Sequence, residues 1–322
     1  MKFDLRQLKM LWYDFFFKPV SPAPFCLFRI FFGLIVLLSF IDCLPSATTL
    51  FGVDGVTSQA LVNSAQHGYR LGLFYLFPPS TTCVLGTMLM LILASITLTL
   101  GWHTRFSASI VWFLLLSFRN RNPYVWNCGD ELIQIVSFLI LLGPSGAMYS
   151  VDAWMKSKRT IKGEQAENKV EYSPWAQRLV QIQLCVVYAV SFFCKSGRTW
   201  HDGTAVYYAM HIRFFTHYCP PYIFDHLWTC QLFTWSTLAI EFSLFTLIWI
   251  KPCRLFVLAV GVCMHLAMLF CMNLHVLELI ILACYINFID ARIVERMVTL
   301  SVAKASVVRN TIFGIRGLTG GA

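Results

Sequence analysis

The chain has 322 residues, of which 57% are hydrophobic and only 13% are charged, and its mean hydropathy is +0.65. Soluble domains carry roughly 25% charged residues, so this chain lacks the polar surface of an ordinary soluble protein, and we expect most of it to lie in a lipid bilayer. The formal net charge is +9. The basic residues are scattered over predicted loops without a nucleic-acid-binding motif, so nucleic acid is not an expected partner.

The predicted elements begin with residues 1–19, an amphipathic and aromatic segment that favours a cytoplasmic or interfacial helix. Residues 20–290 form a predicted membrane domain, and residues 291–322 a cytoplasmic tail. Continuous apolar runs favour helices over the alternating strands of a membrane barrel, although some runs are shorter than the ~20 residues of a full span. The sequence therefore predicts an all-α membrane protein, a polytopic bundle of about eight transmembrane or membrane-embedded helices. The predicted helices are 24–44, 82–101, 106–118, 131–145, 179–195, 228–250, 255–272 and 276–290.

Basic residues indicate how this bundle is oriented. Most of the 25 Lys and Arg residues fall in the segments that lie on the same side of the predicted spans as the N-terminus. Cytoplasmic loops carry such an excess. We therefore predict a multi-pass protein of the cell membrane with both termini in the cytoplasm.

Polar residues at membrane depth are the next signal, because each is costly unless it is paired or used. Glu241 and His265 lie inside consecutive antiparallel runs at similar depth. They could form a hydrogen bond that faces the interior of the bundle, or they could have a functional role. Arg29 lies close to the inner boundary of its run, where its side chain could extend to the interface.

Two predicted outer loops carry further candidates. The first holds a polar group formed by Arg119, Arg121, Asn127 and Asp130. Asp130 also suits the first turn of the following helix, where an acidic side chain is favoured. The second loop begins at Lys195, which alone would be interpreted as an interfacial anchor. Neither the His residues of that loop nor the 12 cysteines of the chain have a metal-ligand spacing, so no metal is expected.

Seven sequence motifs, in order and at compatible spacing, resemble the HTTM (horizontally transferred transmembrane) family. This is the membrane domain shared by vitamin K-dependent γ-glutamyl carboxylases and many small bacterial proteins. The resemblance covers nearly the whole membrane domain. The motifs are LFRIFFG, VDGV, LTLGWHTRFS, RNRNPYVWNCGDEL, GPSGAMYSVDAW, KSGRTWHDGTAVYYAM and HLAMLFCMNL.

The resemblance implies roles for particular residues. Lys195, ahead of Trp200, stands where the carboxylases carry a lysine that acts on a reduced, vitamin K-like quinone. A lysine that acts as a base has to lose its proton, and burial beside apolar surface favours the neutral amine. His265 and Asn273 match a histidine-to-asparagine pair where a quinone or lipid headgroup could be held.

The sequence also departs from the carboxylase pattern. The loop NPYVWNCGDEL contains no histidine, whereas the animal carboxylases carry a catalytic histidine there. Residues 291–322 follow the last predicted span, in the place where the carboxylases have a large lumenal domain. We therefore expect a reaction other than the full carboxylation of a propeptide-bearing substrate.

Three hypotheses for function remain. The first is a membrane enzyme with an extracytoplasmic-facing site that uses a quinol or lipid and acts on an exported peptide or a lipid. Lys195 and Asp130 would then be catalytic, and Arg119, Arg121, Asn127, Trp200, Glu241, His265 and Asn273 would bind substrate or cofactor. The second is a non-catalytic partner for the maturation or export of a secreted peptide, similar to the membrane component that helps to mature the sporulation-delaying toxin of bacilli. The third, a lipid or quinone transporter, is least favoured because no internal repeat is visible.

Overall fold

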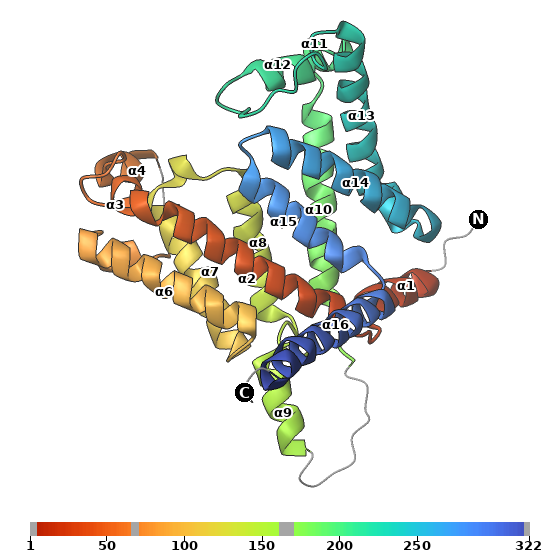
Figure 1. Ribbon diagram of the computed structural model, residues 1–322. Helices are drawn as coiled ribbons and strands as arrows, with labels where there is room; N and C mark the ends of the chain where they lie inside the picture. The colour runs from red at the N-terminus through yellow and green to blue at the C-terminus, as the bar shows by residue number, and fades with distance from the viewer. Residues whose placement is uncertain (1–4, 66–70, 161–170, 319–322) are drawn as a thin grey trace.

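The protein is a bundle of helices (Figure 1). The structure, a computed structural model, describes residues 5–65, 71–160 and 171–318. Within these ranges no strand is longer than an isolated bridge, and the regular elements are α-helices and short 3-10 helices. The predicted all-α fold is therefore confirmed.

Each of the eight predicted apolar runs forms a helix. These helices are α2 (Ala23–Cys43), α6 (Thr81–Leu100), α7 (Thr104–Arg121), α8 (Cys128–Leu142), α10 (Trp175–Cys194), α13 (Leu227–Phe245), α14 (Lys251–Cys271) and α15 (His275–Tyr285). The chain ends carry α1 (Leu5–Phe17) and α16 (Ala291–Leu318). Shorter connecting helices are α3 (Ala47–Phe51), α4 (Gln59–Ala65), α5 (Leu73–Leu76), α9 (Val151–Thr160), α11 (Arg198–His201) and α12 (Ala205–His211), with 3-10 turns η1 (Leu44–Ser46), η2 (Pro123–Val125), η3 (Leu247–Trp249) and η4 (Ile286–Phe288).

Not every helix is long enough to cross a membrane alone. Among the described residues, four stretches have the length and apolar character of a span: Ala23–Phe51, Thr81–Leu100, Trp175–Cys194 and Lys251–Cys271. Helix α15 has 11 residues, and at 1.5 Å per residue it measures about 16 Å. The hydrocarbon core is about twice as thick. The predicted count of about eight spans is therefore not established.

Helix α15 lies between two groups of helices (Figure 1). In one group α2 packs on α6, α6 on α7 and α7 on α8, and in the other α10, α13 and α14 pack in turn. Helix α15 contacts α2 and α8 of the first group, and α10 and α14 of the second. The residues that α15 buries therefore connect the two groups.

The ends of the bundle differ in what covers them. Helices α1 and α16 lie across the end from which α9 also projects, whereas α11 and α12 lie at the opposite end (Figure 1). Helix α1 buries none of its residues, in agreement with the helix predicted within residues 1–19. Lys195, which follows the last residue of α10, lies at the end that carries α11 and α12.

Arg29 is the centre of a buried cluster near α9. Its side chain is fully buried, and its Nη2 donates to the carbonyl of Tyr149 at 2.6 Å. Gly101 closes the cluster with φ +71°, and a Cβ there would lie 1.8 Å from Arg29 Nη1. The predicted extension of Arg29 to the interface is therefore wrong, because the end of α6 and the turn before α9 enclose its guanidinium.

Asp152 of α9 joins the same region by capping the start of α7. Its carboxylate accepts hydrogen bonds from the amide of His103 at 2.9 Å, the amide of Thr104 at 2.8 Å and the Thr104 hydroxyl at 2.7 Å. Burial alone would raise the pKa of Asp152, but these bonds outweigh it and hold the pKa below its ordinary value. Three of the motifs, LFRIFFG, LTLGWHTRFS and GPSGAMYSVDAW, thus meet in one structural cluster.

Candidate functional site

A row of polar side chains follows one face of α10. Gln181, Tyr188, Ser191 and Lys195 are separated by seven, three and four residues, and such spacings place side chains on the same face of a helix. Gln181 and Tyr188 are buried, and the partners of all four lie on the helices that surround α10. The row leads from the interior of the bundle to the end covered by α11 and α12.

Lys195 caps the C-terminus of α10 and directs its amine toward the bundle. Its Nζ donates to Ser191 Oγ at 2.6 Å and forms an ion pair with Glu241 Oε1 of α13. The Lys195 side chain is 19% exposed and that of Glu241 only 8%. A lysine that anchors a helix end extends its amine toward water. The Lys195 amine instead turns inward, toward a buried carboxylate.

Trp200 covers the amine of Lys195. Lys195 Nζ lies 5.2 Å from the centroid of the Trp200 ring, within the range of a cation–π interaction. The turn after Trp200 is fastened to α13, because the hydroxyl of Thr234 donates to the carbonyl of Gly203 at 3.0 Å. Gly203 has φ +80°, and a Cβ there would lie 2.5 Å from Gln231. The motif KSGRTWHDGTAVYYAM thus packs over the end of α10 and is held there by its contacts with α13.

Asp202 stabilises the same turn. Its Oδ1 accepts hydrogen bonds from the hydroxyl of Thr204 at 2.6 Å and from the amide of Thr204 at 3.0 Å. These bonds, together with the positive charge of Arg198, hold the pKa of Asp202 below its ordinary value. Asp202 is therefore an anion at neutral pH that holds the turn closed.

His265 belongs to a second polar cluster, which is deeper in the bundle. Its Nε2 shares a hydrogen bond of 2.6 Å with the hydroxyl of Tyr188, and its Nδ1 contacts Glu278 Oε2 of α15. The Tyr188 hydroxyl is also hydrogen-bonded to that of Tyr285. All four side chains are at most 3% exposed. Carboxylate, imidazole and phenol are thus connected in one line within the bundle.

The predicted hydrogen bond between Glu241 and His265 is wrong. Their helices do pack together, but Glu241 turns toward Lys195 of α10, and both ring nitrogens of His265 are occupied by Tyr188 and Glu278. The positions of the two residues in the sequence predict a similar depth in the membrane. The rotation of each helix about its axis, however, decides which neighbour a side chain contacts.

Four residues of these clusters, Tyr188, Ser191, Glu278 and Tyr285, were not among the predicted site residues. A signal for two of them was present in the sequence. Tyr188 and Ser191 precede Lys195 by seven and four residues in an otherwise apolar run, so they share its helix face. Tyr285 carries no such signal, because a tyrosine at the end of an apolar helix is common at membrane interfaces.

Two buried carboxylate oxygens have no hydrogen-bond partner among the described residues. They are Oε2 of Glu241 and Oε1 of Glu278. Both carboxylates lie within electrostatic range of the hydroxyls of Tyr188 and Tyr285. Buried acceptors are almost always paired, so these oxygens mark places where a proton, a water molecule or a bound hydroxyl can be received.

The predicted polar group of the first outer loop forms a separate cluster. Arg119 pairs with Glu131 at 2.6 Å in a half-exposed position. Arg121 is 1% exposed and donates to the carbonyls of Thr57 and Gly52. These bonds hold the loop that contains the motif VDGV. Neither arginine is hydrogen-bonded or ion-paired to Lys195.

Asn127 and Asp130 are hydrogen-bonded to each other at the start of α8. The Asn127 side chain accepts hydrogen bonds from the amides of Gly129 and Asp130, and the Asp130 carboxylate accepts one from the amide of Asn127 at 3.0 Å. This reciprocal arrangement is a capping box. The contacts of Asp130 are therefore those of an acidic residue in the first turn of a helix, which was the alternative interpretation of this residue.

Asn273 is also separate from His265. Its side-chain amide donates to the carbonyl of Phe214 at 3.3 Å, and its backbone amide donates to that of Phe215 at 2.8 Å. Asn273 thus fastens the segment after α12 to the end of α14. The predicted histidine-to-asparagine pair does not form one site through direct contacts.

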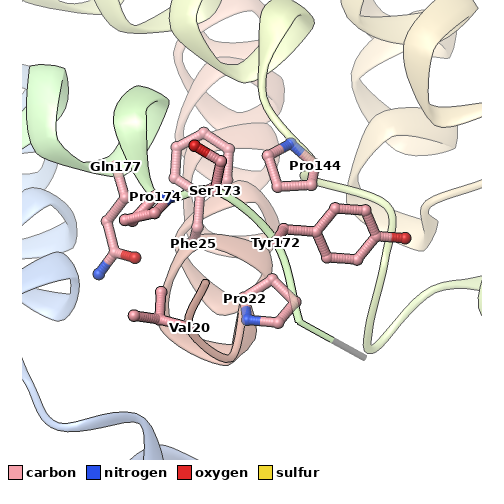
Figure 2. Close-up of a pocket in the computed structure, with 8 residues that line it drawn as sticks. All are labelled: Val20, Pro22, Phe25, Pro144, Tyr172, Ser173, Pro174 and Gln177. Atoms are coloured by element: carbon pink, nitrogen blue, oxygen red, sulfur yellow. The ribbon is translucent and has the colours of Figure 1, made fainter. Parts of the chain in front are cut away.

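A surface hollow of about 200 Å³ lies at the other end of the bundle (Figure 2). Val20 and Pro22 from the chain before α2 face Tyr172, Ser173 and Pro174 from the chain before α10 across it. Its lining contains no acidic, basic or histidine side chain and none of the predicted site residues. Among these lining residues, Tyr172 carries the ionisable group.

Fold and site together define an all-helical membrane protein with a lysine–glutamate pair above a buried tyrosine–histidine–glutamate cluster. Groups of His, Cys, Asp and Glu that could hold a metal ion are absent from the described residues. The HTTM domain family matches residues 17–292, and the chain belongs to this family. Its relation to the membrane domain of vitamin K-dependent carboxylases is implied by that membership.

A curated relative adds little about activity. The chain is 26% identical over 210 residues to the uncharacterized protein YitO of Bacillus subtilis (strain 168). The match covers 62% of this chain and 65% of that relative, slightly less than two thirds of its length. No solved structure matches the chain.

Proposed function

We propose that this protein is a membrane enzyme in which Lys195 is the base, acting on a reduced quinone or a lipid and, through it, on an exported peptide or lipid. The observation that carries this proposal is the position of the Lys195 amine, which is enclosed by Ser191, Glu241 and Trp200 at the end of an apolar helix. A positioned amine that is shielded from water is suited to removing a proton from a bound substrate.

Two side chains beside Lys195 support the binding of a reduced quinone. The buried Oε2 of Glu241 has no partner among the described residues and can accept a hydrogen bond from a hydroxyl group. The Trp200 ring, beside the amine, offers an apolar face for an aromatic ring. A vitamin K-like quinol, when bound, supplies a removable hydroxyl proton and reducing electrons. Lys195 receives that proton, while Ser191 and Glu241 hold the amine in place.

The distribution of basic residues supports one orientation of the site. Lys and Arg gather on α1, α9 and α16, and these helices lie at the end opposite Lys195 (Figure 1). The positive-inside rule then supports cytoplasmic termini and an extracytoplasmic Lys195 in a multi-pass protein of the cell membrane. An exported peptide or a lipid of the outer leaflet could reach such a site.

Substitution of Lys195 tests the proposal. Purified protein in lipid nanodiscs is given a reduced naphthoquinone, and consumption of the quinol is followed by absorbance. Mass spectrometry of co-purifying quinones and lipids measures binding. We expect Lys195→Ala and Lys195→Gln to lose activity by about 100-fold or more, because a general base contributes about that much. Lys195→Arg also fails, because a guanidinium keeps its proton.

The matched control is Lys158→Ala, which removes an exposed lysine of α9 and leaves activity unchanged. Full activity of Lys195→Gln, with quinone binding intact, would exclude a base at this position. A stable complex with another protein on purification would then support the alternative, a non-catalytic partner in the maturation or export of a secreted peptide.

A further inference from the structure

We propose that Tyr188, His265, Glu278 and Tyr285, here called the tyrosine–histidine array, form a proton store that exchanges a proton with Lys195 through Glu241. This proposal rests on the proposed role of Lys195 as a base. It names the group that finally receives the proton that Lys195 takes up. Nothing in the resemblance or in the family match assigns a role to Tyr188, Glu278 or Tyr285.

The first argument is the ion pair itself. A carboxylate next to an amine favours the charged ammonium, so the contact with Glu241 opposes the action of Lys195 as a base. Lys195 can act repeatedly only if its proton leaves the amine. Glu241 Oε1 is in direct contact with Nζ and is the nearest group that can receive this proton.

The second argument is the placement of the array. Tyr188 lies one helical turn below Ser191 on the same face of α10, and Ser191 donates to Glu241 at 3.2 Å. The free Oε2 of Glu241 is buried, and Glu241 lies within electrostatic range of the Tyr188 hydroxyl. Because Tyr188 shares a face of α10 with Ser191, the hydrogen-bond partner of Glu241, we infer that Tyr188 is the group that receives a proton from Glu241.

The third argument is the order of groups beyond Tyr188. The Tyr188 hydroxyl meets His265 Nε2 at 2.6 Å, and Nδ1 of the same ring meets Glu278. A carboxylate on one ring nitrogen orients the imidazole and stabilises the imidazolium that forms when the other nitrogen takes a proton. Glu278 is fully buried, so its charge acts on His265 with little screening by water.

The proton transfer balances without any further reactant. A proton passes from Lys195 Nζ to the carboxylate of Glu241, which leaves a neutral amine and a neutral acid. Glu241 then passes a proton to the Tyr188 oxygen, through a change of its rotamer or one water molecule, while the original Tyr188 proton moves to His265 Nε2. The result is a carboxylate at Glu241, an unchanged phenol at Tyr188, and an imidazolium paired with the carboxylate of Glu278.

Few other ionisable groups face the array. Glu241 of α13 lies within electrostatic range of the hydroxyls of Tyr188 and Tyr285, and the buried Cys284 of α15 lies within range of the Tyr285 hydroxyl. Among the described residues, no arginine or lysine is ion-paired with any member of the array. The charged groups within and next to the array are therefore Glu278, Glu241 and Lys195.

The test follows the protonation of His265 directly and needs no substrate. Protein with ¹⁵N-labelled histidine is placed in lipid nanodiscs, and NMR spectra are recorded from pH 5 to pH 9. The chain has eight histidines, and the His265 signals are those that disappear in His265→Gln. We expect the broadening of these signals by proton exchange on the μs–ms timescale, measured by relaxation dispersion, to be lost in Lys195→Met, because this variant removes the proton donor of the route.

Two variants of nearly equal size separate a proton route from a structural contact. In Tyr188→Phe the route is interrupted without removal of a charge, and we expect the response of His265 to Lys195→Met to disappear. Tyr285→Phe leaves the route from Glu241 to His265 intact and keeps the response. The array is not a proton store if His265 stays in one protonation state throughout, or if the response persists in Tyr188→Phe. Either result leaves the quinol assay of Lys195 unaffected, so the two proposals can fail separately.

Discussion

Single side chains in this protein are defined by the partner that each one meets. Lys195 and Glu241 illustrate this, because each was recognisable as a polar residue at an apolar depth, yet neither could be interpreted alone. Their pairing removes a nearly buried carboxylate and an amine from contact with lipid. A buried pair adds little stability compared with apolar side chains, but the loss of one partner is costly.

This asymmetry predicts the result of a double-mutant cycle. Glu241→Leu alone should lower the free energy of unfolding by about 3 kcal/mol, because the ammonium of Lys195 loses its counter-charge. In the double variant Glu241→Leu with Lys195→Met, most of this loss should be recovered. Thermal unfolding in detergent measures both. If the two single effects simply add, the residues are not coupled and the ion pair is not formed in the membrane.

At the scale of helices, the short α15 is held by close backbone contact. Gly129, in the first turn of α8, lies against the backbone of Leu277 in α15, and a Cβ at Gly129 would come within 2.8 Å of it. The adjacent residue of α15 is Glu278, which holds His265. The capping box of the first outer loop therefore positions the deeper polar cluster, although its own residues do not contact that cluster.

Gly129→Ala should consequently destabilise the protein by about 1–3 kcal/mol, because the backbones of α8 and α15 are forced apart. Gly86 of α6 is the matched control, since nothing lies within 4 Å of a Cβ placed there. Gly86→Ala should be neutral or stabilise the protein by up to about 1 kcal/mol. Equal stability of the two variants, measured by thermal unfolding, would contradict the close contact of α8 with α15.

Helices were more predictable from the sequence than their contacts. The eight apolar runs are helices because a continuous apolar segment in lipid has to satisfy its backbone hydrogen bonds internally. The assignment of Glu241 to His265 failed because sequence neighbours need not be contact partners, and helix rotation depends on packing against several helices at once. Arg29 was misplaced for the same reason, since Tyr149 and Gly101, which enclose it, are distant in sequence.

On the scale of the whole molecule, the proposed orientation can be tested by labelling. Ala60 and Ser157 are exposed and lie in α4 and α9. In a background without the 12 native cysteines, an impermeant maleimide should label Ala60→Cys in intact cells and Ser157→Cys only after lysis. Labelling of Ser157→Cys in intact cells would reverse the orientation and place Lys195 on the cytoplasmic side.

The hydrogen bond between Arg29 and Tyr149 also has a consequence for biosynthesis. The two residues are 120 positions apart, and ribosomes add about 5–20 residues per second, so the first apolar helix exists for roughly 6–24 seconds before its partner emerges. During that interval a guanidinium near the end of a nascent span costs up to about 3 kcal/mol to insert. Until the turn before α9 has been made, the guanidinium can extend to the interface, and its final burial then marks the assembly of the first half of the bundle.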